Sequence, residues 1–218
     1  MITRRAFTAA MSLTGIAALA GFSPLRLISR ATAQSATDIA KPVSLPDMAL
    51  GPKDAPVTIT EFASMTCPHC AAFNAEVFPK IKSTYIDTGK IRYIFREFPL
   101  DVRAASGSML ARCVAKDDAP KFFTMVDVLF RQQNDWAFAK NATEGLSRIG
   151  KQAGFSQEMI NTCLTDQVLL NKIDADRKYA NEILKVNSTP TFFINGEIIK
   201  GEASFDVFDE KIKSMLKS

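Results

Sequence analysis

Residues 57–62 read Val57-Thr58-Ile59-Thr60-Glu61-Phe62, and residues 67–70 read Cys67-Pro68-His69-Cys70. The first run is rich in β-branched residues and predicts a strand. Pro68 stands where a helix would begin, because a missing N–H costs nothing at the first helical position. Two cysteines spaced in this way at a helix start are typical of a dithiol that cycles between thiolate and disulfide. The pair therefore favours thiol–disulfide exchange.

A predicted βαβ unit surrounds this pair. Apolar residues recur at helical spacing from Pro68 to about residue 84, and Pro79 inside that run predicts a kink. Gly89 ends the helix, and residues 90–98 form a second predicted strand. Upstream, residues 34–54 are polar and interrupted by proline and glycine, so we expect a tail there.

The centre of the chain has a helical pattern throughout and contains no strand candidate. Predicted helices lie near 102–117, 119–132, 142–153, 156–165 and 167–185. Strand character returns at 191–194, where Asn195-Gly196 predicts a hairpin turn into 197–200. An amphipathic helix is predicted from Phe205 to Leu216. Four aromatic residues of the helical block are expected in its core: Phe122, Phe123, Phe130 and Trp136.

The first 33 residues have the composition of an export signal. Arg4 and Arg5 precede an apolar run, and Ala31-Thr32-Ala33 suits cleavage before Gln34. The run is shorter than the roughly 20 residues of an ordinary membrane span, which makes an uncleaved anchor the weaker alternative. The arginine pair followed by Phe7 also fits the twin-arginine signal in part, so either that route or the general secretory (Sec) route is open.

All of the net charge belongs to this predicted signal. The chain has 27 Lys and Arg against 23 Asp and Glu. Four of the arginines and none of the acids lie in residues 1–33, which leaves 23 bases against 23 acids in the mature part. A balanced mature chain gives no reason to expect nucleic acid or an anionic membrane surface as a partner. Arg92, Arg96 and Arg103 are expected on solvated faces.

All four cysteines lie in the mature part, where an oxidising compartment would allow two disulfides in three connectivities. The spacing favours Cys67 with Cys70, which leaves Cys113 with Cys163. Both of the latter fall in predicted helices, so we expect a structural disulfide within the helical block. A second redox pair that modulates the first is the alternative.

Three segments in this order resemble the DsbA-like thiol–disulfide oxidoreductases of the bacterial periplasm, which have a thioredoxin fold with a helical insertion. The segments are Ala55-Pro56-Val57 with Glu61-Phe62-Ala63-Ser64 and the cysteine pair, then Phe95-Arg96-Glu97-Phe98-Pro99-Leu100, then Ser188-Thr189-Pro190-Thr191-Phe192-Phe193-Ile194-Asn195-Gly196. The resemblance covers most of residues 55–217. It implies an α/β fold in which 55–100 and 187–218 form a thioredoxin-like domain and 101–186 form an inserted all-helical domain.

The resemblance also implies roles for the site residues. Cys67 is the attacking thiolate, and Cys70, one turn deeper, is its buried partner. The Pro68-His69 dipeptide tunes the couple and resembles that of oxidising members. We expect the helix dipole and the His69 side chain, as hydrogen-bond donor and partial cation, to stabilise the thiolate. Glu61 is implied to be a buried acid that handles protons for Cys70, whereas its residue type alone favours an outward-facing side chain.

Thr189-Pro190 completes the implied site. By resemblance this peptide bond is cis and leaves the Thr189 backbone free to pair with an extended substrate. A plain strand-opening proline is the alternative. The implied substrates are unfolded or extended cysteine-containing exported proteins, and the implied reoxidant is a DsbB-like membrane quinone reductase. No cofactor and no metal are required, and we expect a periplasmic monomer.

Two other functions stay open. Threonine before the proline also occurs in disulfide isomerase relatives, although residues 34–54 are too few for the dimerisation domain that such isomerases and reductases usually carry. A non-catalytic, chaperone-like binding module would use its cysteines structurally. Haem attachment of the c type is disfavoured because Ala71, not histidine, follows Cys70. A zinc site would need ligands beyond one cysteine pair and a lone histidine.

Overall fold

The structure is a computed structural model that describes residues 38–41 and 44–217, so the expected export signal lies outside the described residues. Five strands form one sheet: β1 (Met48–Leu50), β2 (Val57–Ala63), β3 (Ile91–Glu97), β4 (Thr191–Ile194) and β5 (Glu197–Lys200). Their order across the sheet is β1-β3-β2-β4-β5. β2 and β3 run parallel, and the other neighbours pair antiparallel.

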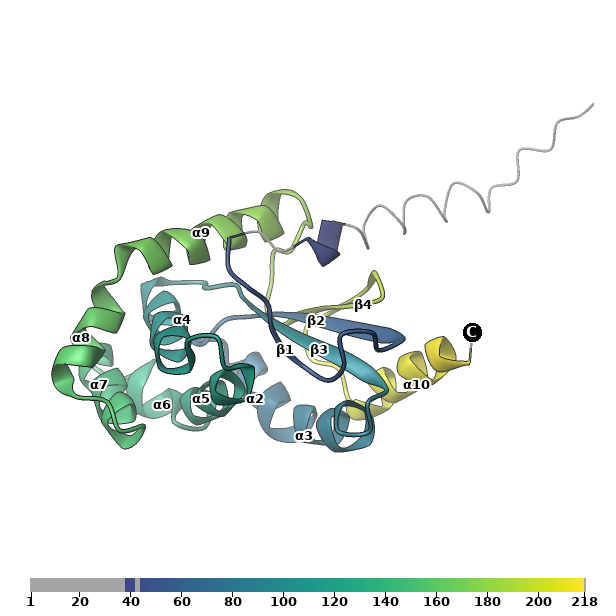
Figure 1. The fold of residues 1–218 in the computed structure, drawn as a ribbon, viewed down its shortest axis with the longest axis horizontal. Helices are drawn as coiled ribbons and strands as arrows, with labels where there is room; N and C mark the ends of the chain where they lie inside the picture. Colours follow the sequence, from purple (N-terminus) through teal and green to yellow (C-terminus); the bar gives the residue numbers. More distant parts are fainter. Residues whose placement is uncertain (1–37, 42–43, 218) are drawn as a thin grey trace, which may run out of the picture.

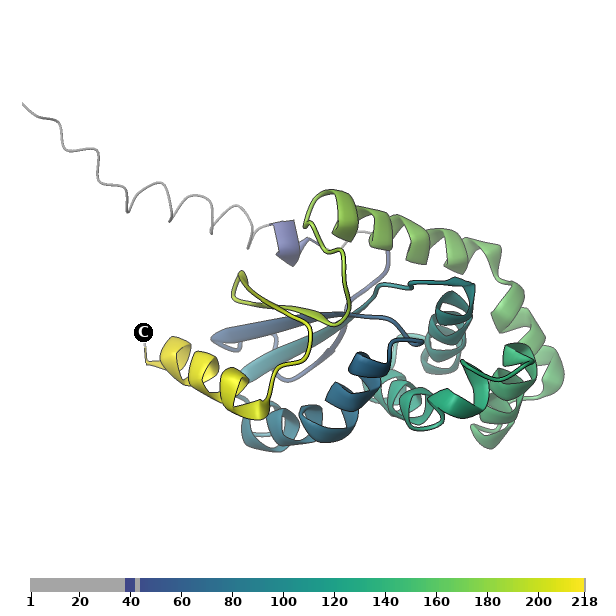
Figure 2. The ribbon, with the colours of Figure 1, turned by 180° about the vertical axis from the view of Figure 1, so that it is seen from behind.

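Helices cover both faces of the sheet (Figures 1 and 2). Successive side chains of a strand point to opposite faces, so each face has its own core. Ile59 and Phe192 belong to the core that α2 (Pro68–Glu76), α3 (Phe78–Ile81), the π-helical turn η1 (Lys82–Ile86) and α10 (Phe205–Leu216) close. Phe62 and Phe193 belong to the opposite core, under α9 (Gln167–Glu182). β2 is the central strand of the sheet, and α2 follows its carboxyl end.

The remaining helices form a block at one end of the sheet (Figure 1). They are α4 (Val102–Ala115), α5 (Ala119–Arg131), α6 (Gln133–Trp136), α7 (Ala142–Gln152) and α8 (Gln157–Thr165). Except in α6, side-chain caps define where these helices begin, because each capping oxygen accepts a hydrogen bond from a main-chain N–H of the first turn. The capping residues, including that of α9, are Asp101, Asp118, Asn141, Ser156 and Asp166. The expected α/β class with helices between the second and third predicted strands is confirmed.

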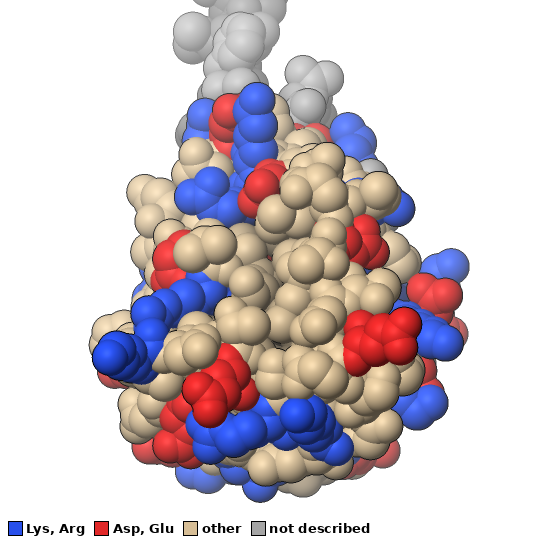
Figure 3. Space-filling view, turned by 90° about the vertical axis from the view of Figure 1, so that its left-hand side faces the viewer, with Lys and Arg blue, Asp and Glu red and all other residues tan. Residues whose placement is uncertain are grey.

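The four aromatic residues predicted for the core of this block are all buried, which confirms that prediction. At the end of the molecule where α7 and α8 lie, acidic and basic side chains are interspersed with uncharged surface (Figure 3). That face offers no field of a single sign. None of the described helices is long and apolar enough to cross a bilayer.

The structure refines or corrects the predictions at several places. The interruption expected from Pro79 is present: the helix expected to run to residue 84 is divided at Val77, because Pro79 cannot continue a helix but fits the first turn of the next one. The short helix α6 lies between the predicted helices 119–132 and 142–153, where no helix was predicted. Arg96 is not solvated. Its guanidinium donates to both carboxylate oxygens of Asp47, at 2.9 and 3.1 Å, and its side chain is 11% exposed.

Part of the expected tail is a strand. β1 pairs antiparallel with β3, with Met48 opposite Phe95 and Leu50 opposite Tyr93. The close approach of β3 explains Gly51: its φ is +83°, and a Cβ there would lie 2.1 Å from the carbonyl oxygen of Ile91. Three apolar residues between prolines carry too little pattern to be told from a linker.

Candidate active site

The cysteine pair lies at the start of α2, just after the loop that follows β2. The chain turns after β2 through a hydrogen bond from the Cys67 N–H to the Ser64 carbonyl, at 3.0 Å. Cys67 is the N-cap of α2, with extended backbone angles and no side-chain cap of its own, and Pro68 opens the helix. Its sulfur therefore faces main-chain N–H groups that the helix leaves unpaired. Both thiols are free, and both residues are buried.

Four donor groups act on the ionised Cys67 sulfur. The Cys70 thiol is the largest cause that lowers the pKa of Cys67, from 9.0 to about 5. Donation by the Thr189 side chain and by the main-chain N–H groups of Cys70 and His69 lowers that pKa further, while burial opposes the change. Cys67 is therefore a thiolate at neutral pH, as a sulfur nucleophile or leaving group must be.

Cys70 behaves in the opposite way. Burial, the hydrogen bond to Cys67 and the charge of Glu61 raise the pKa of Cys70 well above 9.0. The two sulfurs of the pair thus differ in protonation at pH 7, with the outer one ionised and the inner one a thiol. This asymmetry gives each sulfur a separate role in exchange, because only a thiolate attacks a disulfide and a sulfur with a lowered pKa is the better leaving group when a mixed disulfide is resolved.

The sheet brings Thr189 and Pro190 to the cysteine pair. β4 begins directly after Pro190 and pairs with β2, so that Thr191 lies opposite Phe62. The Thr189–Pro190 peptide bond is cis. In the thiol form Cys67 donates to the Thr189 carbonyl oxygen, at 3.3 Å, while the buried Thr189 hydroxyl has no hydrogen-bond partner among the described residues. On ionisation the carbonyl loses its donor, and the hydroxyl can then donate to the thiolate.

Glu61 is buried within β2, facing the core and not the solvent. The Tyr93 hydroxyl donates to its Oε2 at 2.6 Å, and its Oε1 is buried with no partner among the described residues. Burial is the main cause that raises the pKa of Glu61 from 4.5 to about 8; the Tyr93 bond opposes it and the Cys67 charge adds to it. A carboxyl group that gains and loses a proton near neutral pH, within electrostatic reach of Cys70, can serve proton transfer.

His69 differs from the expectation in its geometry. Its side chain is 63% exposed, and the ring Nδ1 contacts the carboxylate Oε1 of Glu202, in the segment between β5 and α10. The group of His69 that donates to the Cys67 sulfur is its main-chain N–H. The imidazole therefore acts on the thiolate through charge and not through a hydrogen bond.

Contacts from the helical block hold the loop that carries Cys67. The side-chain amide of Gln133 donates to the carbonyl oxygens of Met65 and Cys67, at 2.9 and 3.1 Å. The Thr66 hydroxyl donates to Asp101, the cap of α4, at 2.6 Å. The orientation of the cysteine pair thus depends on α4 and α6 as well as on the sheet.

Sequence reasoning missed three residues of this site: Tyr93, Gln133 and Glu202. Tyr93 had a signal, because it alternates with Ile91 and Phe95 on a buried face, where a hydroxyl needs a partner. Gln133 and Glu202 had none, since their contacts join segments far apart in the sequence.

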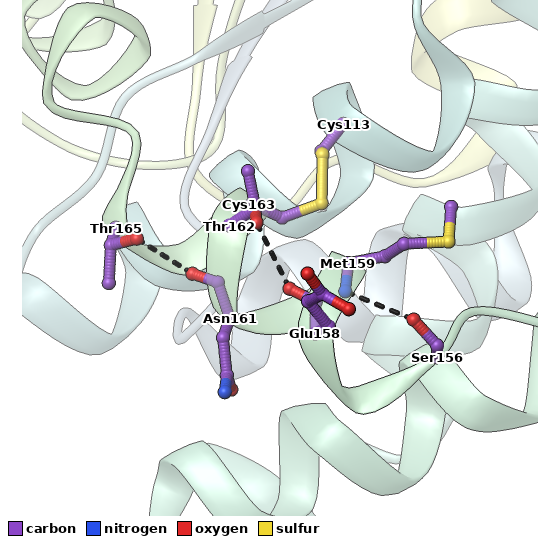
Figure 4. The surroundings of a disulfide bond; sticks show 8 residues. All are labelled: Cys113, Ser156, Glu158, Met159, Asn161, Thr162, Cys163 and Thr165. Atoms are coloured by element: carbon purple, nitrogen blue, oxygen red, sulfur yellow. Dashed lines mark hydrogen bonds between the residues drawn. A yellow bond between two sulfur atoms is a disulfide. The ribbon is translucent and has the colours of Figure 1, made fainter.

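The second cysteine pair lies inside the helical block. Cys113 of α4 and Cys163 of α8 are joined by a disulfide, with Cα atoms 5.6 Å apart (Figure 4). Cys163 follows the first turn of α8, which Ser156 caps through the Met159 N–H. Within the described residues, no cluster of three or more His, Cys, Asp or Glu side chains could hold a metal ion.

Comparison with known proteins adds independent evidence. The thioredoxin family model matches residues 44–214. A putative protein-disulfide oxidoreductase of Rickettsia bellii is 37% identical over 150 residues, which are 69% of this chain and 57% of that protein. Disulfide bond formation protein D of Bacillus subtilis is 29% identical over 170 residues, 77% of this chain and 76% of that protein. The chain thus spans little more than half the length of the Rickettsia bellii relative.

A solved structure agrees over nearly its whole length. The crystal structure of Wolbachia pipientis alpha-DsbA1 is similar with a TM-score of 0.76 and 33% sequence identity, covering 84% of this chain and 96% of that chain.

Proposed function

The chain belongs to the thioredoxin family and to its DsbA-like members, and from this premise we propose that it is a dithiol oxidase that donates its Cys67–Cys70 disulfide to exported proteins. The observation that carries the proposal is that the pKa values of the two thiols are shifted in opposite directions. The pKa of Cys67 is lowered to about 5, and that of Cys70 is raised. A stabilised thiolate favours the reduced pair, which makes the disulfide form a strong oxidant.

The reaction proceeds in two exchanges. A substrate thiolate attacks Cys67 Sγ of the disulfide, the Cys67–Cys70 bond breaks, and Cys70 leaves and takes up a proton. A second substrate thiolate then attacks the substrate sulfur of the mixed disulfide, and Cys67 leaves as a thiolate. Two substrate thiols are oxidised to one disulfide, and both electrons end on the cysteine pair. These two exchanges need no cofactor, because both electrons move between sulfur atoms.

Glu61 would serve the proton transfer at Cys70. Its pKa of about 8 leaves it mostly protonated at pH 7, and its Oε1 has no hydrogen-bond partner among the described residues. The Tyr93 hydroxyl fixes the other carboxylate oxygen. Pro68 sets the start of α2, and His69 adds positive charge beside the thiolate.

The substrates would be cysteine-containing chains in an unfolded or extended state, paired with the backbone beside the cis Thr189–Pro190 bond. The export signal predicted for residues 1–33 supports a periplasmic site of action, reached by the Sec or the twin-arginine route. There, a DsbB-like membrane quinone reductase would reoxidise the pair. We expect the enzyme to act as a monomer, with 55–100 and 187–218 as its thioredoxin-like domain, 101–186 as its helical domain and Cys113–Cys163 as its structural disulfide.

Oxidative refolding tests the proposal. The oxidised mature chain is mixed with a reduced, unfolded protein that contains cysteines, and loss of substrate thiols is followed together with refolding. We expect one substrate disulfide per molecule of oxidised chain and none from the Cys67→Ser variant. Activity retained in Cys67→Ser would exclude the assignment and favour a binding module.

Isomerase activity is the second candidate, because a threonine before the proline, as at position 189, also occurs in disulfide isomerase relatives. Scrambled substrate separates the two, because an isomerase in its reduced form restores activity to a fully oxidised but mispaired protein. The equilibrium constant of the pair with glutathione ranks the activities on one scale. We expect a constant in the oxidising range and slow rescue of the scrambled substrate.

A further inference from the structure

Glu202 lies outside every motif of the sequence and touches the cysteine site through one side chain. It follows Gly201 at the end of β5, and its carboxylate meets the Nδ1 atom of His69 from a position 133 residues away. Both side chains are exposed, at 61% and 63%. The contact joins the C-terminal hairpin of the sheet to the first turn of α2.

We propose that Glu202 is a positioning residue of the redox pair, whose carboxylate keeps the His69 imidazole protonated and oriented, and thereby prevents titration of His69 from adding to the pH dependence of the oxidising strength of Cys67–Cys70. The inference rests on the proposed function, since it concerns the regulation of that same pair.

The charges around His69 support this role. The described titratable groups that act on the imidazole are Glu202, from the β5–α10 segment, and Cys67, at the start of its own helix. Hydrogen bonding to Glu202 is the largest cause that raises the pKa of His69, and the charges of Glu202 and Cys67 raise it further. A carboxylate on Nδ1 fixes that nitrogen as a donor and leaves Nε2 free.

The role has a signature in the pH dependence. In the wild type the thiolate faces an imidazolium that is already paired with a carboxylate, and this arrangement changes little as the pH varies. Without the carboxylate, the imidazole of His69 is a lone cation at low pH and neutral at high pH. A lone cation stabilises the Cys67 thiolate more than a neutralised one does. Removing Glu202 should therefore make the pair more oxidising than the wild-type pair at low pH. This difference from the wild type should disappear as the pH rises and His69 loses its proton.

The first measurement is an NMR titration of the imidazole in the oxidised protein, where Cys67 and Cys70 do not titrate. His69 is the only histidine in the sequence, so its ring signals need no assignment. We expect Glu202→Gln to lower the pKa of His69 toward its ordinary value. Glu210→Gln, an exposed residue of α10, removes the same charge without the contact and should leave that pKa near the wild-type value. Equal effects of the two variants, or no effect, would overturn the proposal.

The second measurement is the equilibrium constant with glutathione at low ionic strength, between about pH 5 and 8, where a histidine titrates. The constant is written for reduction of the pair by glutathione, so that a larger value means a more oxidising pair. We expect the ratio of the Glu202→Gln constant to the wild-type constant to fall roughly two- to fivefold from the low to the high end of this range, a size that suits an exposed charge pair. A ratio that does not vary with pH would refute the coupling to the redox pair. Absence of any exchange with glutathione in the wild type would instead refute the proposed function, while the NMR result would stand.

Discussion

The side-chain amide of Gln133, the first residue of α6, donates a hydrogen bond to the carbonyl oxygen of Cys67 at 3.1 Å. The same amide donates to the Met65 carbonyl oxygen at 2.9 Å, and the Gln133 side chain is buried. That carbonyl of Cys67 also accepts the first helical bond of α2, from the Ala71 N–H. One side chain of the helical block thus fixes the backbone on which the reactive sulfur is carried.

Replacing Gln133 with alanine should leave two buried carbonyl oxygens short of a donor. We expect a loss of about 1–3 kcal/mol in the free energy of unfolding, measured with urea. Amide hydrogen exchange should rise in the loop before α2. Gln132→Ala is the matched control, because among the described residues the Gln132 side chain bonds only to Gln152, at the surface. If both variants lost the same stability, the clamp on the Cys67 loop would have no energetic weight.

The pKa of Cys67 should depend on the donor at position 70. The Cys70 thiol is the largest cause of the lowered pKa, so Cys70→Ala should raise the pKa of Cys67 from about 5 toward 9.0. Cys70→Ser keeps a donor and should raise it much less. Thiolate absorbance in the ultraviolet reports Cys67 alone in both variants, because Cys113 and Cys163 are joined in a disulfide. A Cys70→Ala variant that ionised at the wild-type pH would show that the helix start alone sets the Cys67 pKa.

Glu61 should make the folded protein less stable as the pH rises. Its pKa is 4.5 without burial and about 8 in the fold, so the unfolded chain loses its proton first. The stability contributed by the neutral form is fully present below pH 4.5 and declines until about pH 8, by roughly 1.4 kcal/mol per pH unit at most. We expect Glu61→Gln to gain stability relative to the wild type between pH 5 and 8, measured by urea unfolding of the oxidised protein.

Glu76→Gln provides the comparison for this effect. Glu76 is exposed on α2, so its substitution should shift stability by a small amount that does not follow this trend. A constant difference between Glu61→Gln and the wild type across the range would mean that Glu61 ionises in the fold as it does in water.

Local pattern sufficed to predict most elements of the fold. Alternation and β-branching predicted β2 and β4, and Asn195-Gly196 predicted the hairpin, where Asn195 has a φ of 45° and Gly196 a φ of 96°. The helical period gave α10 the bounds that the structure shows. These signals are local because hydrogen bonds and burial within each element repeat along the chain. β1 lacked such a repeat, since its pairing with β3 is what makes it a strand.

The candidate site was predictable only in part. The spacing of Cys67 and Cys70 predicted the redox pair. The segments around Glu61 and Pro190 were recognised by their resemblance to DsbA-like oxidoreductases. Three residues that bond to the site come from elsewhere in the chain: Tyr93, Gln133 and Glu202. Their contacts are consequences of tertiary packing. Only Tyr93 had a local signal, its place on the buried face of β3, and no periodicity marks the other two. Arg96 shows the same limit, because only the fold brings Asp47 to it.

The Cys113–Cys163 disulfide should act as a staple within the helical block. It closes a separation of 50 residues, for which the chain-entropy account gives about 4 kcal/mol of stabilisation. We expect the double variant Cys113→Ala/Cys163→Ala to lose a stability of this order in urea unfolding. The pKa of Cys67 and the equilibrium constant with glutathione should both keep their wild-type values, because the bridge joins α4 to α8 and makes no bond to Cys67 or Cys70. A variant that kept its stability but shifted that equilibrium constant would reverse the assignment and make Cys113 and Cys163 a second redox pair.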